Sequence, residues 1–108
     1  MRNDELVWRM VDERRDPYAA LSDRVWGMPE LCYNEHRSAA EHKAMLEAEG
    51  FRVTADVAGI PTALMGEYGE GGPVIAILGE YDALPGLSQE AGIAEKRPME
   101  GDTNGHGC

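Results

Sequence analysis

The segment Pro73-Val74-Ile75-Ala76-Ile77-Leu78 constrains the fold more than any other, because no polar side chain interrupts it. A continuous apolar run of this length is typical of a strand that is covered on both faces, as in the sheet of an α/β protein. The preceding residues Gly69-Glu70-Gly71-Gly72 are rich in the residue that tolerates positive φ, which predicts a turn. A chain of 108 residues can bury roughly two-thirds of its unfolded surface. Residues 73–78 are therefore expected to lie inside a sheet.

Two helical segments are predicted before this strand. In the first segment, apolar residues return to one helical face, at Val7, Val11, Tyr18, Leu21 and Val25. Pro17 interrupts the pattern, and Asp16-Pro17 fits an N-cap followed by the first helical residue, which predicts two abutting helices or one kinked helix. Gly27 and Pro29 are expected to end this segment.

The second helix is predicted from Glu35 to Glu49. Asn34 fits its N-cap, and Gly50 fits the position after its end, where a left-handed residue is favoured. Its inner face is expected to carry Ala39, His42, Met45 and Leu46. We therefore interpret His42 as a partly buried helix residue and not as a ligand, whereas His36 in the first turn is expected to be exposed.

The period of the pattern changes after this helix. Residues 51–57 alternate between apolar and polar, as a half-buried strand does, and residues 62–68 form a second predicted strand. Two helices followed by three strands predict the opening of an α/β or α+β domain, and the apolar run favours α/β with a mixed sheet. Residues 83–108 show little periodicity, and a long loop in a compact domain is usually functional or disordered.

The charge distribution excludes one class of partner. The chain carries 20 acidic residues against 10 Lys and Arg, a net charge of −10, and no Lys or Arg falls between Val53 and Glu95. Binding to a phosphate backbone needs clustered Lys and Arg, so no nucleic-acid partner is expected. We interpret the acidic stretch as a solvated surface. The alternative is that some of its carboxylates face a metal ion.

Cysteine usage and hydropathy bear on the compartment. Cys32 and Cys108 provide no disulfide framework. The N-terminal residues are charged throughout, without the apolar region of a signal peptide, and no apolar run approaches the length of a membrane span. A cytoplasmic protein with two free thiols and no membrane association is expected.

Two carboxylates follow the apolar run directly. Glu80 and Asp82 are two residues apart, so in an extended backbone they share a side. Ligand sites of open α/β sheets form outside the carboxyl ends of the strands. Paired carboxylates at such a place are costly unless a cation meets them. Either a metal ion meets them, or the strand has reached solvent and both are hydrated.

The last residues contain a second candidate for metal binding. His106 and Cys108 are also two apart, and imidazole and thiolate suit zinc and, less selectively, other divalent transition metals. The flanking glycines would allow the backbone to bend around an ion. A tetrahedral zinc site needs three or four ligands, however, so this pair is a weak motif on its own. Nucleophilic catalysis by a Cys–His pair is a further alternative, for which no orienting third group is evident.

Four stretches of the chain together carry a family resemblance. They read "VWGMPELCYNE" at 25–35, "SAAEHKAMLEAEGFRVT" at 38–54, "PVIAILGEYDALPGLSQEAG" at 73–92 and "NGHGC" at 104–108. On these residues the chain resembles family twenty of the metallopeptidases, the aminoacylase and carboxypeptidase group of metal-dependent amidohydrolases. The third stretch is the most specific, and it favours the p-aminobenzoyl-glutamate hydrolase branch. The resemblance runs from Asp4 to Cys108.

This resemblance implies a catalytic α/β domain with two adjacent divalent metal ions, zinc or manganese, and a smaller inserted domain that often mediates dimerisation. A metal-bound water would attack the amide carbonyl with a glutamate as general base. Cys108 matches the first metal ligand of the branch, and Asp82 matches an aspartate that orients a ligand. Glu80 lies where other branches have a His ligand, so its role as a ligand is doubtful. His106 matches a motif residue beside the ligands and is not expected to bind metal.

The resemblance also implies what residues 1–108 would lack: the general base, the later ligands, the inserted domain and the rest of the catalytic domain. The chain is thus expected to be the N-terminal part of a longer protein. That protein would hydrolyse an amide in an aminoacyl-glutamate or short peptide conjugate, as a homo- or hetero-oligomer. The fragment alone is expected to be inactive. Three alternatives stay open: a non-catalytic remnant, a chain that binds a partner through residues 73–78, and a small metal binder that uses Glu80, Asp82, His106 and Cys108.

Overall fold

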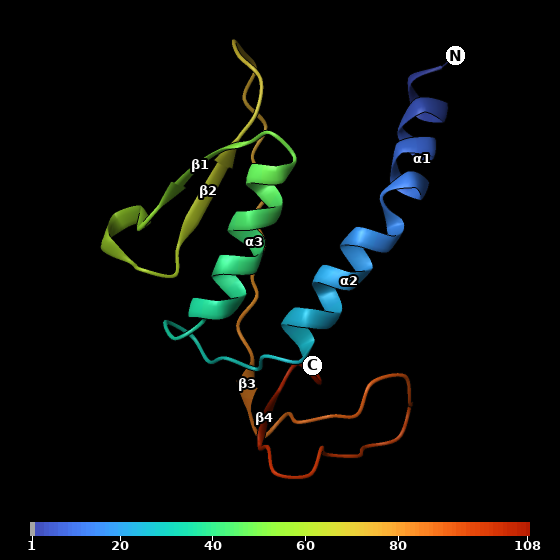
Figure 1. Cartoon of the computed structure of the whole chain (residues 1–108), viewed down its shortest axis with the longest axis vertical. Helices are drawn as coiled ribbons and strands as arrows, with labels where there is room; N and C mark the ends of the chain where they lie inside the picture. Colours follow the sequence, from blue (N-terminus) through green and yellow to red (C-terminus); the bar gives the residue numbers. More distant parts are fainter. Residues whose placement is uncertain (1) are drawn as a thin grey trace.

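The computed structural model describes residues 2–108 of the chain (Figure 1). Its elements are α1 (Asn3–Glu13), α2 (Arg15–Trp26), α3 (His36–Ala48), β1 (Arg52–Ala55), the 3-10 turn η1 (Val57–Gly59), β2 (Leu64–Glu67), β3 (Leu84–Pro85) and β4 (Asn104–Gly105). Helices α1 and α2 form one long arm, and α3 lies between this arm and the β1–β2 hairpin. Within the described residues, no helix is both long and apolar enough for a membrane span.

The first helical segment is divided into two helices, as predicted, but the position of the break was predicted wrongly. The backbone leaves the helical conformation at Arg14, with φ −99° and ψ 2°, and Asp16 does not serve as the N-cap. Pro17 occupies the third position of α2, where its missing N–H would have no helical partner in any case. Its ring cannot be accommodated over a helical carbonyl four residues earlier, at Glu13, so the break falls directly after that residue.

The predicted inner face of the first two helices is largely uncovered. Val7, Val11 and Tyr18 are exposed, while Leu21 and Val25 are partly buried. Helix α1 contains no buried residue. The apolar periodicity thus marks one face, but within the described residues only its C-terminal end, at Leu21 and Val25, is partly covered.

Helix α3 confirms its prediction except at the N-cap, which is Glu35 and not Asn34. At its other end the Gly50 N–H donates to the carbonyl of Glu47 and the Phe51 N–H to that of Leu46. This pair of bonds is a Schellman motif, and Gly50 adopts the left-handed φ of 86° that the motif needs. Of the predicted inner face, Ala39 is buried and His42 is half-buried, whereas His36 is exposed.

The first two predicted strands form a hairpin beside α3. Strands β1 and β2 pair antiparallel, from Arg52 opposite Glu67 to Ala55 opposite Leu64. Gly66 lies against α3, where an added Cβ would lie 3.1 Å from the Leu46 side chain. The glycine therefore allows the hairpin to approach the helix closely.

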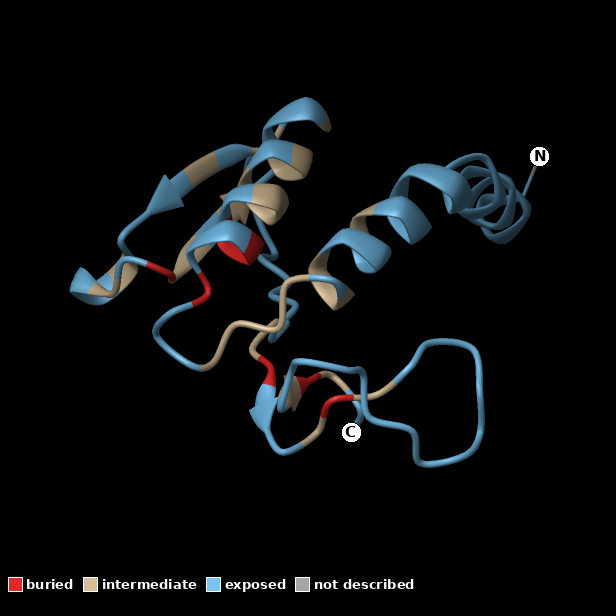
Figure 2. Cartoon of the chain, turned by 60° about the horizontal axis from the view of Figure 1, so that its bottom comes forward, coloured by how far each residue is buried: buried red, intermediate tan, exposed pale blue. Residues whose placement is uncertain are grey.

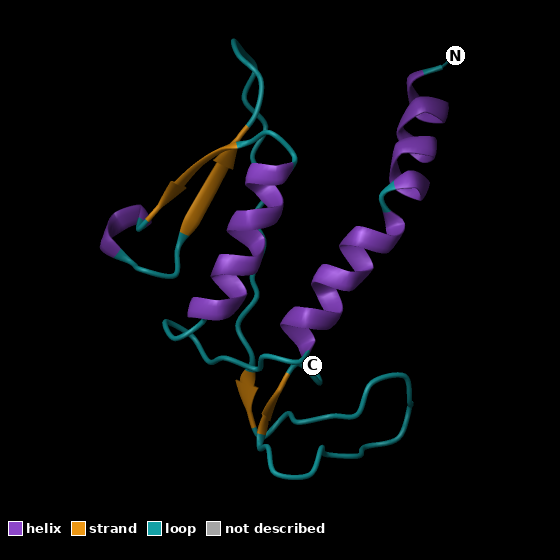
Figure 3. Cartoon of the chain, viewed as in Figure 1, coloured by secondary structure: helices purple, strands orange, loops and turns teal. Residues whose placement is uncertain are grey.

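The prediction for residues 73–78 is wrong. They form no strand, and Figure 3 shows the whole stretch between β2 and β3 as loop. The side chains of Val74, Ile75, Ile77 and Leu78 are between 84% and 94% exposed. The physical reason is that a strand requires a partner for its N–H and C=O groups, and none of the described residues pairs with this segment.

The predicted mixed sheet is therefore also absent from the described residues. The strands form two separate antiparallel pairs, β1–β2 and β3–β4. One isolated parallel bridge joins Leu31 to Ala83, with the Ala83 N–H donating to the Glu30 carbonyl at 2.8 Å. The architecture mixes helices and strands as expected. The long C-terminal stretch is mostly loop, as predicted, and closes on itself through β3 and β4.

The molecule has little apolar core. Among the described residues, the buried apolar ones are Ala39 and Ala83. The radius of gyration is 16.3 Å, against roughly 13 Å for a compact domain of this length. Figure 2 shows that the buried positions lie near the start of α3, in the loop before β2 and in the C-terminal part, while α1 and α2 are mostly exposed. The described residues thus do not form the apolar core that a chain of this length could have.

Candidate functional site

The segment 25–35 contains a residue with a structural task that its sequence pattern does not reveal. The Glu30 carboxylate accepts hydrogen bonds from the backbone N–H of Ser38 at 2.7 Å and of Arg37 at 3.2 Å. It also accepts from Nε of Arg37 at 3.2 Å. Burial works to raise the pKa of Glu30, but these hydrogen bonds outweigh it, so the pKa lies below its ordinary value. Glu30 therefore caps the N-terminus of α3 from outside the helix.

A second contact attaches the residues after the apolar run to α3. The Tyr81 ring lies 4.8 Å from the His42 ring, and its hydroxyl donates to the Thr62 carbonyl. Burial raises the pKa of Tyr81, and the nearby Glu35 carboxylate adds to the shift. Burial lowers the pKa of His42, against the opposing effect of Glu41. His42 is thus a packing residue, as the sequence indicated.

The two carboxylates after the apolar run, Glu80 and Asp82, flank Tyr81 in the sequence. Glu80 is exposed, and Asp82 is half-buried directly before the buried Ala83. Neither forms a hydrogen bond or ion pair within residues 2–108. The predicted orienting role of Asp82 and the doubtful ligand role of Glu80 stay predictions.

His106 and Cys108 lie at the other end of the C-terminal loop. The Nε2 atom of His106 is buried without a hydrogen-bond partner, and its ring centroid is 6.2 Å from that of Trp26. A cavity of about 50 Å³ adjoins both rings, which is enough for a water molecule. Cys108 is exposed, and its Sγ lies 3.8 Å from the His106 carbonyl oxygen.

The glycines around His106 allow this segment to approach Leu87 closely. An added Cβ at Gly105 would lie 2.2 Å from the Leu87 carbonyl oxygen, and one at Gly107 would lie 2.7 Å from the same atom. The Gly107 N–H donates to that oxygen at 3.1 Å. In this structure the glycines allow close packing of residues 104–107 against Leu87 and Ser88.

The four candidate ligands, Glu80, Asp82, His106 and Cys108, do not form a cluster that could hold a metal ion within the described residues. Across residues 2–108, no group of three His, Cys, Asp or Glu side chains is close enough to hold a metal ion. Cys108 supplies one thiol, whereas a zinc site needs three or four protein donors or waters around it. The residues present therefore do not fit a metal centre by themselves.

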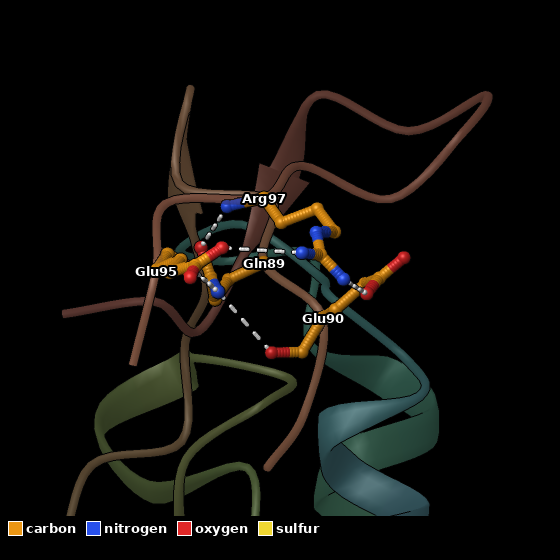
Figure 4. Close-up of polar contacts among 4 residues, drawn as sticks. All are labelled: Gln89, Glu90, Glu95 and Arg97. Carbon is orange, nitrogen blue, oxygen red and sulfur yellow. Dashed lines mark hydrogen bonds and ion pairs between the residues drawn. The ribbon is translucent and has the colours of Figure 1, made fainter. Parts of the chain in front are cut away.

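A larger cavity lies in the C-terminal loop. It has a volume of about 470 Å³ and lies between residues 86–89, residues 93–96 and Gly107. A polar network fixes this loop (Figure 4). The Glu90 N–H donates to the Arg97 carbonyl at 2.8 Å, the Arg97 N–H to Oε1 of Gln89 at 3.0 Å, and Nε2 of Gln89 to the Glu95 carbonyl at 2.8 Å. The lining residues have no periodic pattern from which the cavity could have been predicted.

Comparison with known proteins identifies two hydrolases as relatives. The chain is 43% identical over 106 residues, 94% of its own length, to the B subunit of p-aminobenzoyl-glutamate hydrolase from Escherichia coli. It is 37% identical over 92 residues, 76% of its length, to mouse Xaa-Arg dipeptidase. These similarities confirm the resemblance to family twenty of the metallopeptidases that the four stretches indicated.

The matches cover a small part of each relative. The chain spans 22% of the bacterial protein and 21% of the mouse protein, about a fifth of either. No family model matches the chain. No solved structure shows significant similarity to it.

Proposed function

We propose that this chain forms part of a metal-dependent hydrolase of amide bonds that acts on an aminoacyl-glutamate or a short peptide conjugate. The observation that carries the proposal is the 43% identity over 94% of the chain to a protein named as a hydrolase of p-aminobenzoyl-glutamate. The second relative is named as a dipeptidase, which also cleaves an amide. Both names share one reaction class, although they differ in substrate.

In this proposal, residues 1–108 do not form the reactive centre alone. In the complete protein, Cys108 would supply one thiolate ligand for zinc or manganese, and Asp82 would orient a neighbouring ligand. The remaining donors and the general base come from polypeptide that corresponds to the rest of the relatives' length. Support comes from the lack, within residues 2–108, of any group of three His, Cys, Asp or Glu side chains that could hold a metal ion. It also comes from the small share of each relative that the chain spans. The isolated chain is accordingly inactive.

The proposal includes an assembly with other chains, because the bacterial relative is itself named as one subunit of its enzyme. A non-catalytic, partner-binding chain is the second candidate function. The exposure of Val74, Ile75, Ile77 and Leu78 favours it, since an unpaired apolar segment is a template for association. The two candidates differ in whether the chain supports catalysis in a complete enzyme.

A chimera tests this difference. This chain would replace the matching segment of the Escherichia coli relative, and the other subunits of that enzyme would be supplied. Release of p-aminobenzoate would be measured with added Mn²⁺ or Zn²⁺. We expect the chimera to be active and the isolated 108-residue chain to show no turnover.

The two cysteines provide matched variants for this experiment. Both are exposed and unpaired. Cys108→Ser in the chimera should lower kcat/KM by about 100-fold or more, since a metal ligand is lost, and Cys32→Ser should leave it unchanged. A folded chimera without activity, or full activity of the Cys108→Ser chimera, would count against the proposal.

A further inference from the structure

The cations of the C-terminal loop are not equivalent. Arg97 lies near two carboxylates, with Nη1 3.5 Å from Glu90 and Nη2 3.2 Å from Glu95 (Figure 4). Lys96, its neighbour, forms no ion pair with any described residue. The single positive charge of Arg97 thus faces two carboxylates, Glu90 and Glu95, whereas Lys96 has no charged partner among the described residues.

Lys96 is one of the residues that line the cavity of about 470 Å³. That volume lies in the range of small-molecule sites, which combine an apolar wall with a few polar groups. The apolar wall consists of Leu87, Ile93 and Ala94, and the polar groups include Ser88 and Gln89. Glu95 also lines the cavity, but its carboxylate is held by Arg97.

Hydrogen bonds hold the loop that forms the cavity at Glu95 and Arg97, the residues on either side of Lys96. Gln89 accepts from the Arg97 N–H and donates to the Glu95 carbonyl, so one side chain bridges the two edges of the loop. On the other side, the Ser88 hydroxyl accepts from the Met99 N–H at 3.0 Å. These bonds hold the backbone on both sides of Lys96, so less of the loop has to be ordered when a ligand binds.

We propose that this cavity binds a small organic carboxylate with an apolar body, and that the Lys96 ammonium group pairs with the carboxylate. The apolar body would lie against Leu87, Ile93 and Ala94. Since Gly107 also lines the cavity, a ligand there lies next to Cys108. The identity of the natural ligand rests on the proposed function: it would be the carboxylate-bearing part of the substrate. The binding of a carboxylate at this cavity does not depend on that function.

Titration of the ¹⁵N-labelled chain with sodium benzoate, followed by NMR, tests the site without any metal or turnover. Benzoate combines a carboxylate with an apolar ring, and benzamide is its neutral counterpart. We expect benzoate to shift the amide signals of residues 86–96 and 107 saturably, and benzamide to leave them unshifted at the same concentrations. Equal shifts with benzamide would overturn the assignment of the carboxylate to Lys96.

Three variants decide whether Lys96 is responsible. Lys96→Met keeps much of the apolar stem and removes the charge, and it should weaken benzoate binding at least about fivefold. Lys96→Arg should bind nearly as the parent does. Lys43→Met, which removes a lysine paired with Glu47 on α3, should have no effect. Unaltered binding by Lys96→Met would refute the proposal, as would the absence of saturable shifts in the parent chain.

The outcome is separable from that of the chimera experiment. Benzoate binding that depends on Lys96, together with a folded but inactive chimera, would reject the hydrolase function and keep the site. An active chimera with no benzoate binding to the chain would reject the site and keep the function. Circular dichroism of each variant would confirm that the helical content is unchanged.

Discussion

The Glu30 carboxylate accepts a hydrogen bond from the Ser38 N–H at 2.7 Å, although Glu30 lies eight positions earlier and outside the helix that Ser38 belongs to. Ser38 is fully buried, and the Glu30 side chain is 11% exposed. An unpaired N–H in such a place would cost stability. Glu30 is therefore a helix cap, and its removal would leave the backbone N–H groups of Arg37 and Ser38 without their acceptor.

Glu30→Ala should lower the free energy of unfolding by about 1–2 kcal/mol, as loss of a helix cap does. Glu70→Ala is the matched control, because Glu70 is exposed and forms no side-chain hydrogen bond or ion pair within the described residues. Urea unfolding followed by circular dichroism at neutral pH measures both. Equal stability of the two variants would contradict the capping role.

The same cap predicts a pH dependence. Since the folded-state pKa of Glu30 lies below its ordinary value of 4.5, its stabilisation is fully present above that value and is lost as the pH falls through the folded pKa. The stability difference between the parent and Glu30→Ala should therefore shrink on acidification. Repeating the urea series at several pH values from neutral into the acidic range measures this. A constant difference would show that the carboxylate charge plays no part.

His42 makes a second, higher pH range informative. Burial lowers its pKa below the ordinary 6.5, so the folded state favours the neutral ring. The corresponding stability is fully present above pH 6.5 and is lost as the pH falls through the folded pKa. His42→Gln should remove this loss of stability below pH 6.5. His36→Gln, at an exposed position, should leave it unchanged. Thermal unfolding at several pH values would distinguish the two.

Gly105→Ala should disrupt the packing of the C-terminal loop. Its new Cβ would lie 2.2 Å from the Leu87 carbonyl oxygen and 2.6 Å from the Ser88 Cα, and such overpacking costs about 1–3 kcal/mol. Gly79→Ala is the matched control, since no atom lies within 4 Å of its Cβ position. Hydrogen exchange should become faster at Ser88 and Gly107, whose N–H groups donate across this contact. Unchanged protection there would contradict the packing.

The apolar segment 74–78 should cause the isolated chain to self-associate. Its unpaired backbone and exposed Ile77, at 94%, make it a template for strand pairing. Ile77→Lys should shift the sedimentation profile toward monomer, as a charge on an edge does. Val11→Lys, at an exposed position on α1, should shift it less. A parent chain that stays monomeric at high concentration would contradict this prediction.

Local patterns predicted local structure well. Gly50 ends α3 as its φ preference implies, and the alternation after Phe51 yields one strand of a hairpin. Pro17 indicated a helix break but not its position, because the proline ring acts on the turn that precedes it. Such elements depend on contacts within a few residues, so a single sequence contains the necessary information.

Non-local features were predicted less well. Residues 73–78 have the composition of a buried strand, but burial requires neighbours that residues 2–108 do not supply. The same limit applies to the candidate site, where Glu80, Asp82, His106 and Cys108 were recognised by chemistry and resemblance and are not brought together. Glu30 and Lys96 could not be predicted from the sequence. The contact of Glu30 with Ser38 and the cavity beside Lys96 depend on the folded structure and not on the spacing of residue types.

From the two contacts of Glu30 we also expect an order of events during folding. Its side chain closes a loop of eight residues to Ser38, whereas its carbonyl accepts from the N–H of Ala83, a contact much longer in sequence. The entropy lost on loop closure grows with loop length, and long-range contacts form late. Helix α3 is thus expected to nucleate with its cap in place. The C-terminal loop, with its cavity and Cys108, is expected to dock last, when the Ala83 N–H reaches the Glu30 carbonyl.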